Sequence, residues 1–254
     1  MKNKFTLLGC GSSLGSPWIT NYIGSSRVKK NIRTRCSAHI QYKNISILID
    51  TSPDIKQQLL KNKIKEVDAV VYTHEHADQT SGIFELRPFF WKNKSKIPVY
   101  GSKRTINSVK KNNNYCFKDT QGYTAILKSY IIKNNFLLNK KKNYLKFKCF
   151  EVNHGMIKST VYVFNNIAYI SDCHNIPIKY YKYLYNLKYL IIDCLKMTKH
   201  PSHFNYDEAI KISKILKPKK TILTNMHTDL DYYKLKKILP KGVIAAYDGL
   251  NFNF

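Results

Sequence analysis

Short apolar runs separated by polar turns recur along the chain and set its predicted secondary structure. Runs of about four to eight residues rich in β-branched, aromatic and leucine side chains predict strands. In the first half of the chain these runs cover residues 5–8, 38–42, 45–50, 69–73 and 97–100. In the second half they cover residues 145–152, 161–164, 167–170, 189–193, 221–224 and 244–246. Between them, segments 53–62, 80–90 and 204–216 are predicted helices.

Strands that alternate with helices predict a layered α/β fold. We expect one domain over residues 1–254, because no long linker divides the chain and its 43% hydrophobic content can supply a full core. The helix at 204–216 has clear end signals, with Asn205 as the cap, Glu208 three residues later and Pro218 just past the end. Between residues 103 and 142 the pattern weakens into an insert rich in lysine and asparagine. For this insert we favour a solvated loop over a basic arm above a site.

The distribution of apolar segments and cysteines along the chain indicates in which cellular compartment the protein is expected. No apolar segment reaches the length of a membrane span, and the N-terminus leads into a predicted strand rather than a signal peptide. The sequence therefore predicts a cytoplasmic protein with no membrane partner. Its six cysteines are scattered without a Cys-x-x-Cys pair, which favours reduced thiols over a disulfide framework.

The formal net charge of +27 raises the question of a polyanionic partner. Of the 43 basic residues, five are arginine and 38 are lysine, in a chain also crowded with Asn, Ile and Tyr. These residue types share A- and T-rich codons, so a drift in base composition accounts for the charge as well as selected nucleic-acid binding does. We favour the drift, and nucleic acid remains the less favoured partner.

Metal-binding chemistry gathers where predicted strands end. The apolar run 69–73 leads directly into His74, His76 and Asp78, where neutral imidazoles one residue apart can turn toward a common ion and a carboxylate adds an oxygen donor. Polar residues also follow four other predicted strands, namely Asp50, His154, Asp172 and the pair Asn225 and His227. If these strand ends share one edge of the fold, the side chains converge on one site.

With these residues in place, the sequence resembles the metallo-β-lactamase superfamily over nearly its whole length. That resemblance implies a four-layered αββα fold with the metals at one sheet edge. Four further segments resemble the branch of phosphoribosyl 1,2-cyclic phosphate phosphodiesterases: the turn at 9–17, residues 82–87, the motif at 200–203 and the closing Tyr247-Asp248-Gly249. One difference from the phosphonate-pathway enzymes is the segment 18–35, which lacks the cysteines of their zinc-binding insert.

The resemblance implies that His74, His76 and His154 hold one metal ion, zinc or manganese, with Asp172 bridging toward a second. It implies that Asp50 is an outer carboxylate that orients the ligands. Such a carboxylate would fix an imidazole tautomer and raise its basicity. The resemblance also makes Asp78 a ligand and a catalytic residue, and makes His203 the proton donor to the leaving oxygen. For His203 a purely hydrogen-bonding role stays open.

The second metal position departs from the family pattern. Where the family has histidines, this chain has Gln79 and Asn225. Amide oxygens are poor ligands for soft metals and acceptable ones for hard cations. The second ion is therefore expected to be weak, harder in type or absent, unless His227 partly substitutes.

Arginine is scarce in this chain, and its forked guanidinium matches phosphate oxygens. Arg33, Arg35 and Arg87 are therefore the expected substrate contacts, although each could instead pair with a surface carboxylate.

The leading hypothesis is a metal-dependent phosphodiesterase in which a metal-bound hydroxide attacks a small phosphodiester, such as a cyclic ribose phosphate. The alternatives are an RNA-processing hydrolase resembling tRNase Z and a non-enzymatic metal sensor with a lapsed second site. The oligomeric state is left open, a homodimer included.

Overall fold

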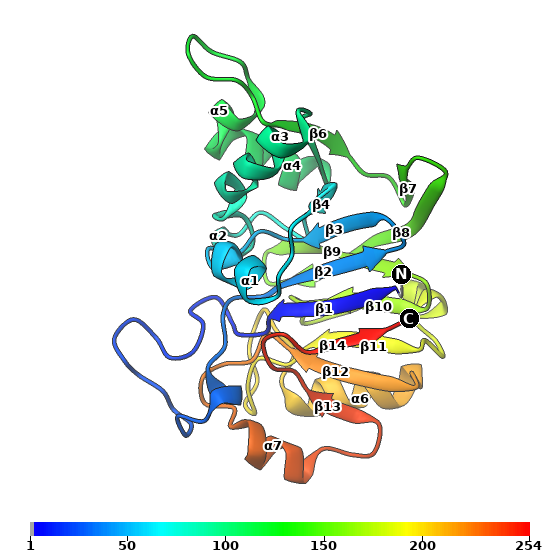
Figure 1. Cartoon of the computed structure of the whole chain (residues 1–254). Coiled ribbons are helices and arrows are strands. Elements are labelled where there is room, and N and C mark those ends of the chain that lie inside the picture. Colours follow the sequence, from blue (N-terminus) through cyan, green and yellow to red (C-terminus); the bar gives the residue numbers. More distant parts are fainter. Residues whose placement is uncertain (1–2) are drawn as a thin grey trace.

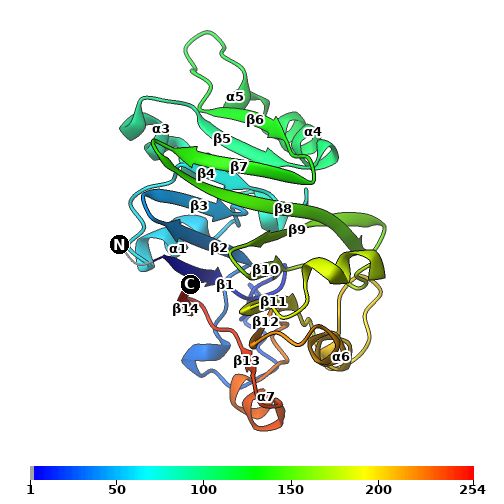
Figure 2. The same ribbon diagram turned by 90° about the vertical axis from the view of Figure 1, so that its right-hand side faces the viewer.

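The computed structural model describes residues 3–254. Two seven-stranded sheets pack against each other, and helices cover their outer faces (Figures 1 and 2). The first sheet has the strand order β14-β1-β2-β3-β4-β5-β6, and the second has the order β13-β12-β11-β10-β9-β8-β7. The αββα fold predicted from the resemblance is confirmed.

The strands of the first sheet are β1 (Lys4–Gly9), β2 (Ser37–Tyr42), β3 (Ile45–Ile49), β4 (Ala69–Val71), β5 (Ile97–Gly101), β6 (Leu127–Ile131) and β14 (Asn251–Asn253). Those of the second are β7 (Asn135–Lys140), β8 (Asn143–His154), β9 (Ile157–Phe164), β10 (Ile167–Ile170), β11 (Tyr189–Asp193), β12 (Lys220–Thr224) and β13 (Val243–Ala245). The α-helices are α1 (Ile55–Lys61), α2 (Ala77–Thr80), α3 (Arg87–Asn93), α4 (Lys103–Asn112), α5 (Asn114–Phe117), α6 (Tyr206–Leu216) and α7 (Tyr232–Ile238). Short 3-10 turns are η1 (Lys29–Asn31), η2 (Ile83–Leu86) and η3 (Ile178–Tyr183).

Strand β4 shows how the sequence builds these layers. Successive side chains of a strand face opposite sides of the sheet. Ala69 and Val71 accordingly lie in the core between the sheets, while Val70 lies in a smaller core under the helices. A strand buried on both faces requires an unbroken apolar run, which is why this segment was predicted from its sequence. Helices α1 and α4 pack on the first sheet, and α6 and α7 pack on the second.

Strand direction brings the polar strand ends together. Strands β3 and β4 are parallel, and so are β10, β11 and β12. Strand β9 is antiparallel to both β8 and β10, so β8 and β10 run in the same direction. The ends of strands that run the same way meet at one edge of a sheet. In this fold, these edges carry the residues that were predicted to bind metal.

The prediction of a solvated loop at residues 103–142 is wrong. This segment forms α4, α5, β6 and β7. Ile106 and Val109, three residues apart on α4, are buried in the core under the helices together with Cys116 of α5. Strands β6 and β7 are the outermost strands of their sheets, where polar and lysine side chains are common. Their polar faces hid the strand pattern, and the short β14 was also missed.

The helix predicted at 80–90 is divided into α2, η2 and α3. Gly82 separates the first two, and a Cβ there would lie 2.1 Å from the carbonyl oxygen of Ser52, so the chain needs glycine at this approach. Pro88 falls in the first turn of α3, a position where its missing N–H costs little. The predicted helix at 204–216 is confirmed, with a capping box formed by Asn205 and Glu208.

The structure also bears on the cysteines and on membrane-spanning segments. The six cysteines are all free and buried. None of the helices in residues 3–254 is long and apolar enough to cross a bilayer.

Candidate metal centre

Asp50 anchors the loop that carries the first two histidines. It follows β3 with a left-handed φ of 62°, a conformation that aspartate tolerates better than most residues, and it is fully buried. Thr73, two residues past β4, donates its backbone N–H to Asp50 Oδ1 at 2.7 Å and its hydroxyl to Oδ2 at 2.8 Å. The Asp50 carboxylate therefore holds Thr73, the residue next to His74. Asp50 thus lies where the resemblance led us to expect an outer carboxylate.

The hydrogen-bond partners determine which imidazole nitrogens carry protons. The Thr73 hydroxyl gives its hydrogen to Asp50, so it can only accept from His74 Nδ1, 3.1 Å away. The carbonyl oxygen of Ser202, 2.8 Å from His154 Nδ1, can also only accept. Both Nδ1 atoms therefore carry a proton in the neutral rings, and both Nε2 atoms keep a free lone pair.

These lone pairs meet His76. His74 Nε2 lies 3.0 Å and His154 Nε2 lies 3.3 Å from His76 Nδ1. Nitrogen ligands at about 2.0–2.1 Å from a tetrahedral zinc ion lie about 3.3–3.4 Å apart, close to these separations. The donor set therefore fits a divalent ion held by His74, His76 and His154.

Two of these imidazoles favour the neutral form, the buried His74 and the more exposed His76. Desolvation lowers the pKa of His74 to about 3, and it also lowers the pKa of His76. A metal ligand must be unprotonated, so both rings are ready to bind an ion at neutral pH.

Asp172, His203 and Asp193 form the adjoining part of the site. Asp172 follows β10 and lies close to His154 and His203, since one ligand-type atom from each lies within 4.8 Å of the others. His203 Nδ1 lies 2.7 Å from Asp193 Oδ2 at the end of β11. Burial opposes the charged form of His203, but the charge of Asp193 and this hydrogen bond raise the pKa of His203 to about 9. His203 therefore holds a proton at neutral pH.

Asp193 was missed at the sequence level. The signal was present, because it ends an apolar run in the same way that Asp50 and Asp172 do. It is fully buried, and it also accepts the backbone N–H of Cys173 at 2.8 Å.

The second metal position is lined by Asp78, Gln79 and Asn225. Burial and the nearby charge of Asp172 raise the pKa of Asp78 to about 6. Gln79 and Asn225 are buried and hydrogen-bonded to the surrounding carboxylates. His227 has other partners, with its Nδ1 3.0 Å from Asp229 and its ring in an edge-to-face pair with Trp18. Within residues 3–254, His227 belongs to neither of the two clusters that could hold an ion.

A pocket of about 730 Å³ opens over the centre. His76, Asp78, His154, Asp172, His203, Asn225 and His227 line it. Its apolar lining, which sequence reasoning did not identify, includes Leu14, Met156, Ile157 and Leu195. His200, the weaker candidate of the motif at 200–203, lines it too. Among the described residues that form this pocket there is no lysine or arginine, although the chain carries 43 of them.

The three arginines expected to contact phosphate lie outside this pocket. Arg33 is 1% exposed, and its guanidinium donates to Asn31 and to the carbonyl oxygens of His227 and Leu230. That expectation is corrected for Arg33, because its charge is used to hold the loops together. Arg35 pairs with Asp54 at 2.9 Å, as the alternative interpretation allowed.

Arg87 stacks over Trp91 and Tyr123, with its guanidinium carbon 4.7 Å from each ring centroid. These aromatic partners place it on the helical layer of the first sheet, so it too has a packing role in this structure.

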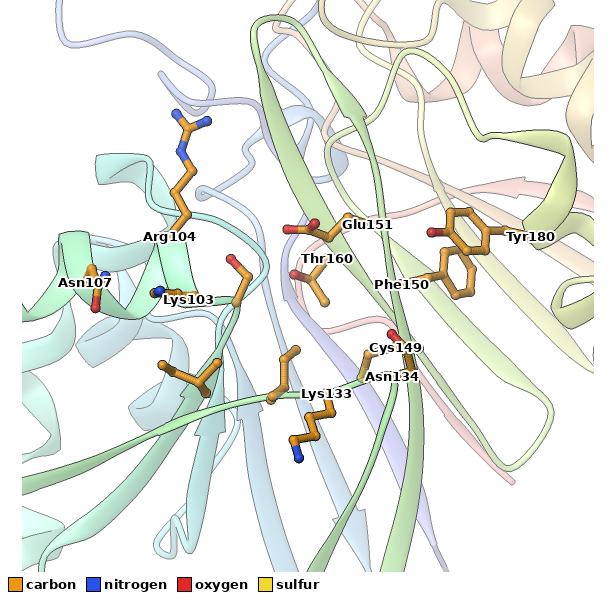
Figure 3. Close-up of a pocket in the computed structure, with 13 residues that line it drawn as sticks. Lys103, Arg104, Asn107, Lys133, Asn134, Cys149, Phe150, Glu151, Thr160 and Tyr180 are labelled. Carbon is orange, nitrogen blue, oxygen red and sulfur yellow. The ribbon is translucent and has the colours of Figure 1, made fainter.

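A second pocket, of about 610 Å³, lies between α4 and the strands β8 and β9 (Figure 3). Lys103, Arg104 and Lys133 line it with Glu151, and Phe150 stacks on Tyr180 with ring centroids 4.4 Å apart. It holds none of the predicted metal ligands among the residues that the structure describes. Arg104 connects it to the metal centre, because Arg104 pairs with Glu75, the residue between His74 and His76.

Comparisons with known proteins agree with this geometry. The beta-lactamase superfamily domain matches residues 46–226, a span that runs from β3 past Asn225. The octanoyltransferase of Porphyromonas gingivalis (strain ATCC BAA-308 / W83) is 30% identical over 250 residues, which is 96% of this chain. The chain spans 50% of that relative's length.

Solved structures give a closer view of the fold. A new diphosphatase from the PhnP family is 31% identical, with a TM-score of 0.91 that covers 100% of this chain and 98% of that one. Zn(2+)-bound PqqB from Methylobacterium extorquens (17% identity, TM-score 0.80) and human tRNase Z, short form (16%, 0.70), share the fold. The match to PqqB covers 99% of this chain and 100% of PqqB. The match to tRNase Z covers 98% of each chain. The chain therefore belongs to the metallo-β-lactamase superfamily and, within it, to the PhnP-like branch.

Proposed function

We propose that this metallo-β-lactamase-fold hydrolase is a metal-dependent phosphodiesterase for a small substrate, such as a cyclic ribose phosphate. One observation carries the proposal: lone pairs of His74 and His154 meet His76 Nδ1 beside Asp172, in the pocket that also holds His203. We propose zinc or manganese as the ion, because imidazole nitrogens suit zinc and the added carboxylates also suit manganese. Such an ion would activate a water nucleophile and screen charge on a phosphoryl oxygen.

The protein's own residues supply orientation and a proton. Asp50 and Thr73 hold the His74 ring, and the Ser202 carbonyl holds the His154 ring. In His203, Nδ1 is directed to Asp193, so the opposite nitrogen, Nε2, is the one free to donate to a leaving oxygen. His203 is well suited to this role because its raised pKa keeps it protonated at neutral pH.

The lining of the pocket supports a small phosphodiester over RNA. A phosphodiester group carries a single negative charge, and one divalent ion with a protonated His203 would supply enough positive charge to hold it. A polynucleotide needs a row of cations along its backbone, and among the described pocket residues none is a lysine or arginine. The apolar residues Leu14, Met156 and Leu195 instead suit a substrate with an apolar or ring-shaped substituent. This disfavours the tRNase Z-like alternative.

The name of the Porphyromonas gingivalis relative describes a protein of about twice this length. We propose hydrolysis, and not octanoyl transfer, for the half that corresponds to this chain, because the pocket presents metal ligands at its base.

The test compares wild type with His76→Ala after loading with Zn²⁺ or Mn²⁺. We expect wild type to hydrolyse bis(4-nitrophenyl) phosphate or a cyclic ribose phosphate, and the variant to lose at least about 100-fold in rate, since even outer residues of metal sites are worth about 10–100-fold. Equal rates in both proteins would reject the proposal. Stoichiometric metal binding without turnover on a broad panel of phosphoesters would favour the sensor alternative.

A further inference from the structure

Gln79 is placed where the family has a metal-binding histidine. It lies on α2 and is fully buried. Its amide nitrogen Nε2 is 3.0 Å from Asp78 Oδ2 and 3.5 Å from Asp172 Oδ2. Carboxylate oxygens accept hydrogen bonds, so the NH₂ end of the amide is the end that faces them. The NH₂ group of Gln79 thus bridges Asp78 and Asp172 through hydrogen bonds. A cation at this place would bridge the same two carboxylates through its positive charge.

Asn225 completes the arrangement from the other sheet. It follows β12 with a φ of 60°, a left-handed conformation that asparagine adopts more readily than most residues, and it is 1% exposed. Its Nδ2 lies 3.2 Å from Asp172 Oδ1 and 3.3 Å from Asp193 Oδ1. Each oxygen of Asp172 therefore faces an amide NH₂ group, one from Asn225 and one from Gln79.

A second divalent ion does not fit this donor arrangement. An ion between Asp78 and Asp172 would meet the hydrogens of both amides, and an amide nitrogen has no free lone pair to offer a metal. To present their oxygens, both side chains would have to rotate and give up the hydrogen bonds that now connect Asp78, Asp172 and Asp193. The two amides also converge on the same aspartate from different elements, Gln79 from α2 and Asn225 from the loop after β12.

From this geometry we infer that the protein is a single-metal member of its superfamily, in which the NH₂ groups of Gln79 and Asn225 occupy the place of the second ion. The inference rests on the proposed function only in that the first ion is the one assigned to His74, His76 and His154. It predicts that Asp172 is held by hydrogen bonds on its second-site side and is not a bridging ligand.

Metal stoichiometry tests this inference directly. Apo-protein, prepared with a chelator, is titrated with Zn²⁺ and with Mn²⁺ by calorimetry, and the loaded protein is desalted and its metal content measured by mass spectrometry. We expect one ion per chain in wild type with either metal. Two ions per chain would overturn the inference, and so would the absence of any bound ion, which would also reject the proposed metal centre.

Paired variants identify the residues responsible. Gln79→His with Asn225→His restores the family's ligand types, and we expect its content to rise from one ion to two. His227→Gln is the matched control, since it changes another residue of the same pocket, and we expect it to stay at one. A double variant that folds by circular dichroism and still binds one ion would overturn the role given to the amides. If the double variant does not fold, the wild-type titration decides by itself.

The outcome is separable from that of the proposed function. One ion per chain, together with no hydrolysis of any phosphodiester, would reject the phosphodiesterase while leaving the single-metal inference in place. Two ions per chain, together with hydrolysis, would overturn the single-metal inference and support the phosphodiesterase.

Discussion

At the residue scale, the proton positions of the metal centre are set from outside it. Asp50 takes the hydroxyl hydrogen of Thr73, and this obliges Thr73 to accept from His74. A main-chain carbonyl does the same for His154. Neither partner touches the ion, yet each determines which nitrogen is free to bind it.

Thr73→Val tests this relay, since valine has nearly the shape of threonine and no hydroxyl. We expect metal affinity to fall about 10–100-fold, because the His74 ring loses the acceptor that fixes its tautomer. Competition with a chromogenic chelator measures the affinity. The control is Thr221→Val, which removes another buried hydroxyl, 2.6 Å from that of Ser213 and remote from the centre. An equal loss of affinity in both variants would refute the relay.

His203→Gln separates proton transfer from hydrogen bonding, because glutamine keeps a donor but has no proton to release. We expect hydrolysis of an alkyl phosphodiester, whose alkoxide needs a proton to depart, to slow about 100–10,000-fold. Hydrolysis of a nitrophenyl ester should slow far less, since its leaving group departs without one. Rate constants for the two substrates give the comparison. Equal slowing of both would favour the purely hydrogen-bonding role.

Sequence reasoning at this scale located the candidate ligands better than the residues that support them. His74, His76, His154 and Asp172 follow predicted strands, and parallel strand ends meet by topology, so their convergence was predictable. Arg33 was assigned from its residue type alone, and residue type cannot reveal that a charge is buried and bonded to main-chain carbonyls.

At the scale of elements, the predictions succeeded where a segment is buried on both faces and failed at the sheet margins. β4 and β11 read as strands because both of their faces need apolar residues. β6 and β7 are outermost strands with exposed, lysine-bearing positions, so their periodicity is weak. The secondary structure of those segments depends on contacts that form only in the folded state, such as the burial of Ile106 in the core under the helices.

Helix α6 offers a prediction about capping, because the chain enters it directly after His203. The Asn205 side chain accepts the backbone N–H of Glu208 at 2.9 Å, and the Glu208 carboxylate in turn accepts the backbone N–H of Asn205 at 3.0 Å. We expect Asn205→Ala to lower the free energy of unfolding by about 1–2 kcal/mol. Urea denaturation measures the change. Lys211→Ala, at an exposed position of the same helix, should change it by less than about 0.5 kcal/mol. Similar losses in the two variants would contradict the capping argument.

At the scale of the whole molecule, acid should weaken the fold through His39. This side chain is 6% exposed in β2, with Nε2 2.8 Å from the Ser46 hydroxyl. Burial, with a smaller effect from the charge of Lys4, lowers the pKa of His39 to about 4, from 6.5 in an exposed histidine. Between these two values the unfolded chain binds the extra proton. Stability from the neutral ring is therefore complete above pH 6.5 and is lost as the pH falls toward 4.

The expected loss over that window is about 3 kcal/mol, from about 1.4 kcal/mol for each pH unit. His39→Gln cannot take up the proton, so its free energy of unfolding should depend less steeply on pH between 6.5 and 4. Urea denaturation across this range, in the presence of a chelator to remove any contribution from bound metal, measures both slopes. Parallel curves for wild type and variant would show that His39 is not the group responsible.

Charge is also a property of the whole molecule, and it is distributed unevenly. The chain has a net charge of +27, while the described lining of the pocket over the candidate metal centre has neither lysine nor arginine. We expect turnover of a small phosphodiester to change only modestly between 50 and 200 mM salt. Non-specific binding to duplex DNA should weaken steeply over the same range. Steady-state kinetics and fluorescence anisotropy give the two dependences, and an equally steep loss of turnover would place lysines near the substrate.

The contact between Arg104 and Glu75 has a consequence for how this enzyme can be altered. Glu75 lies between His74 and His76 of the candidate metal centre, and its partner Arg104 belongs to the lysine- and asparagine-rich segment that its composition made look dispensable. Deleting that segment to obtain a shorter protein would remove the ion pair that holds Glu75 in the loop between His74 and His76. The exposed turn around Gly122 is a better place for an insertion or a tag, provided that Gly122 itself is kept at its φ of 77°. Within this one segment, the start of α4 with Arg104 and the exposed turn at Gly122 therefore differ in value to an engineer.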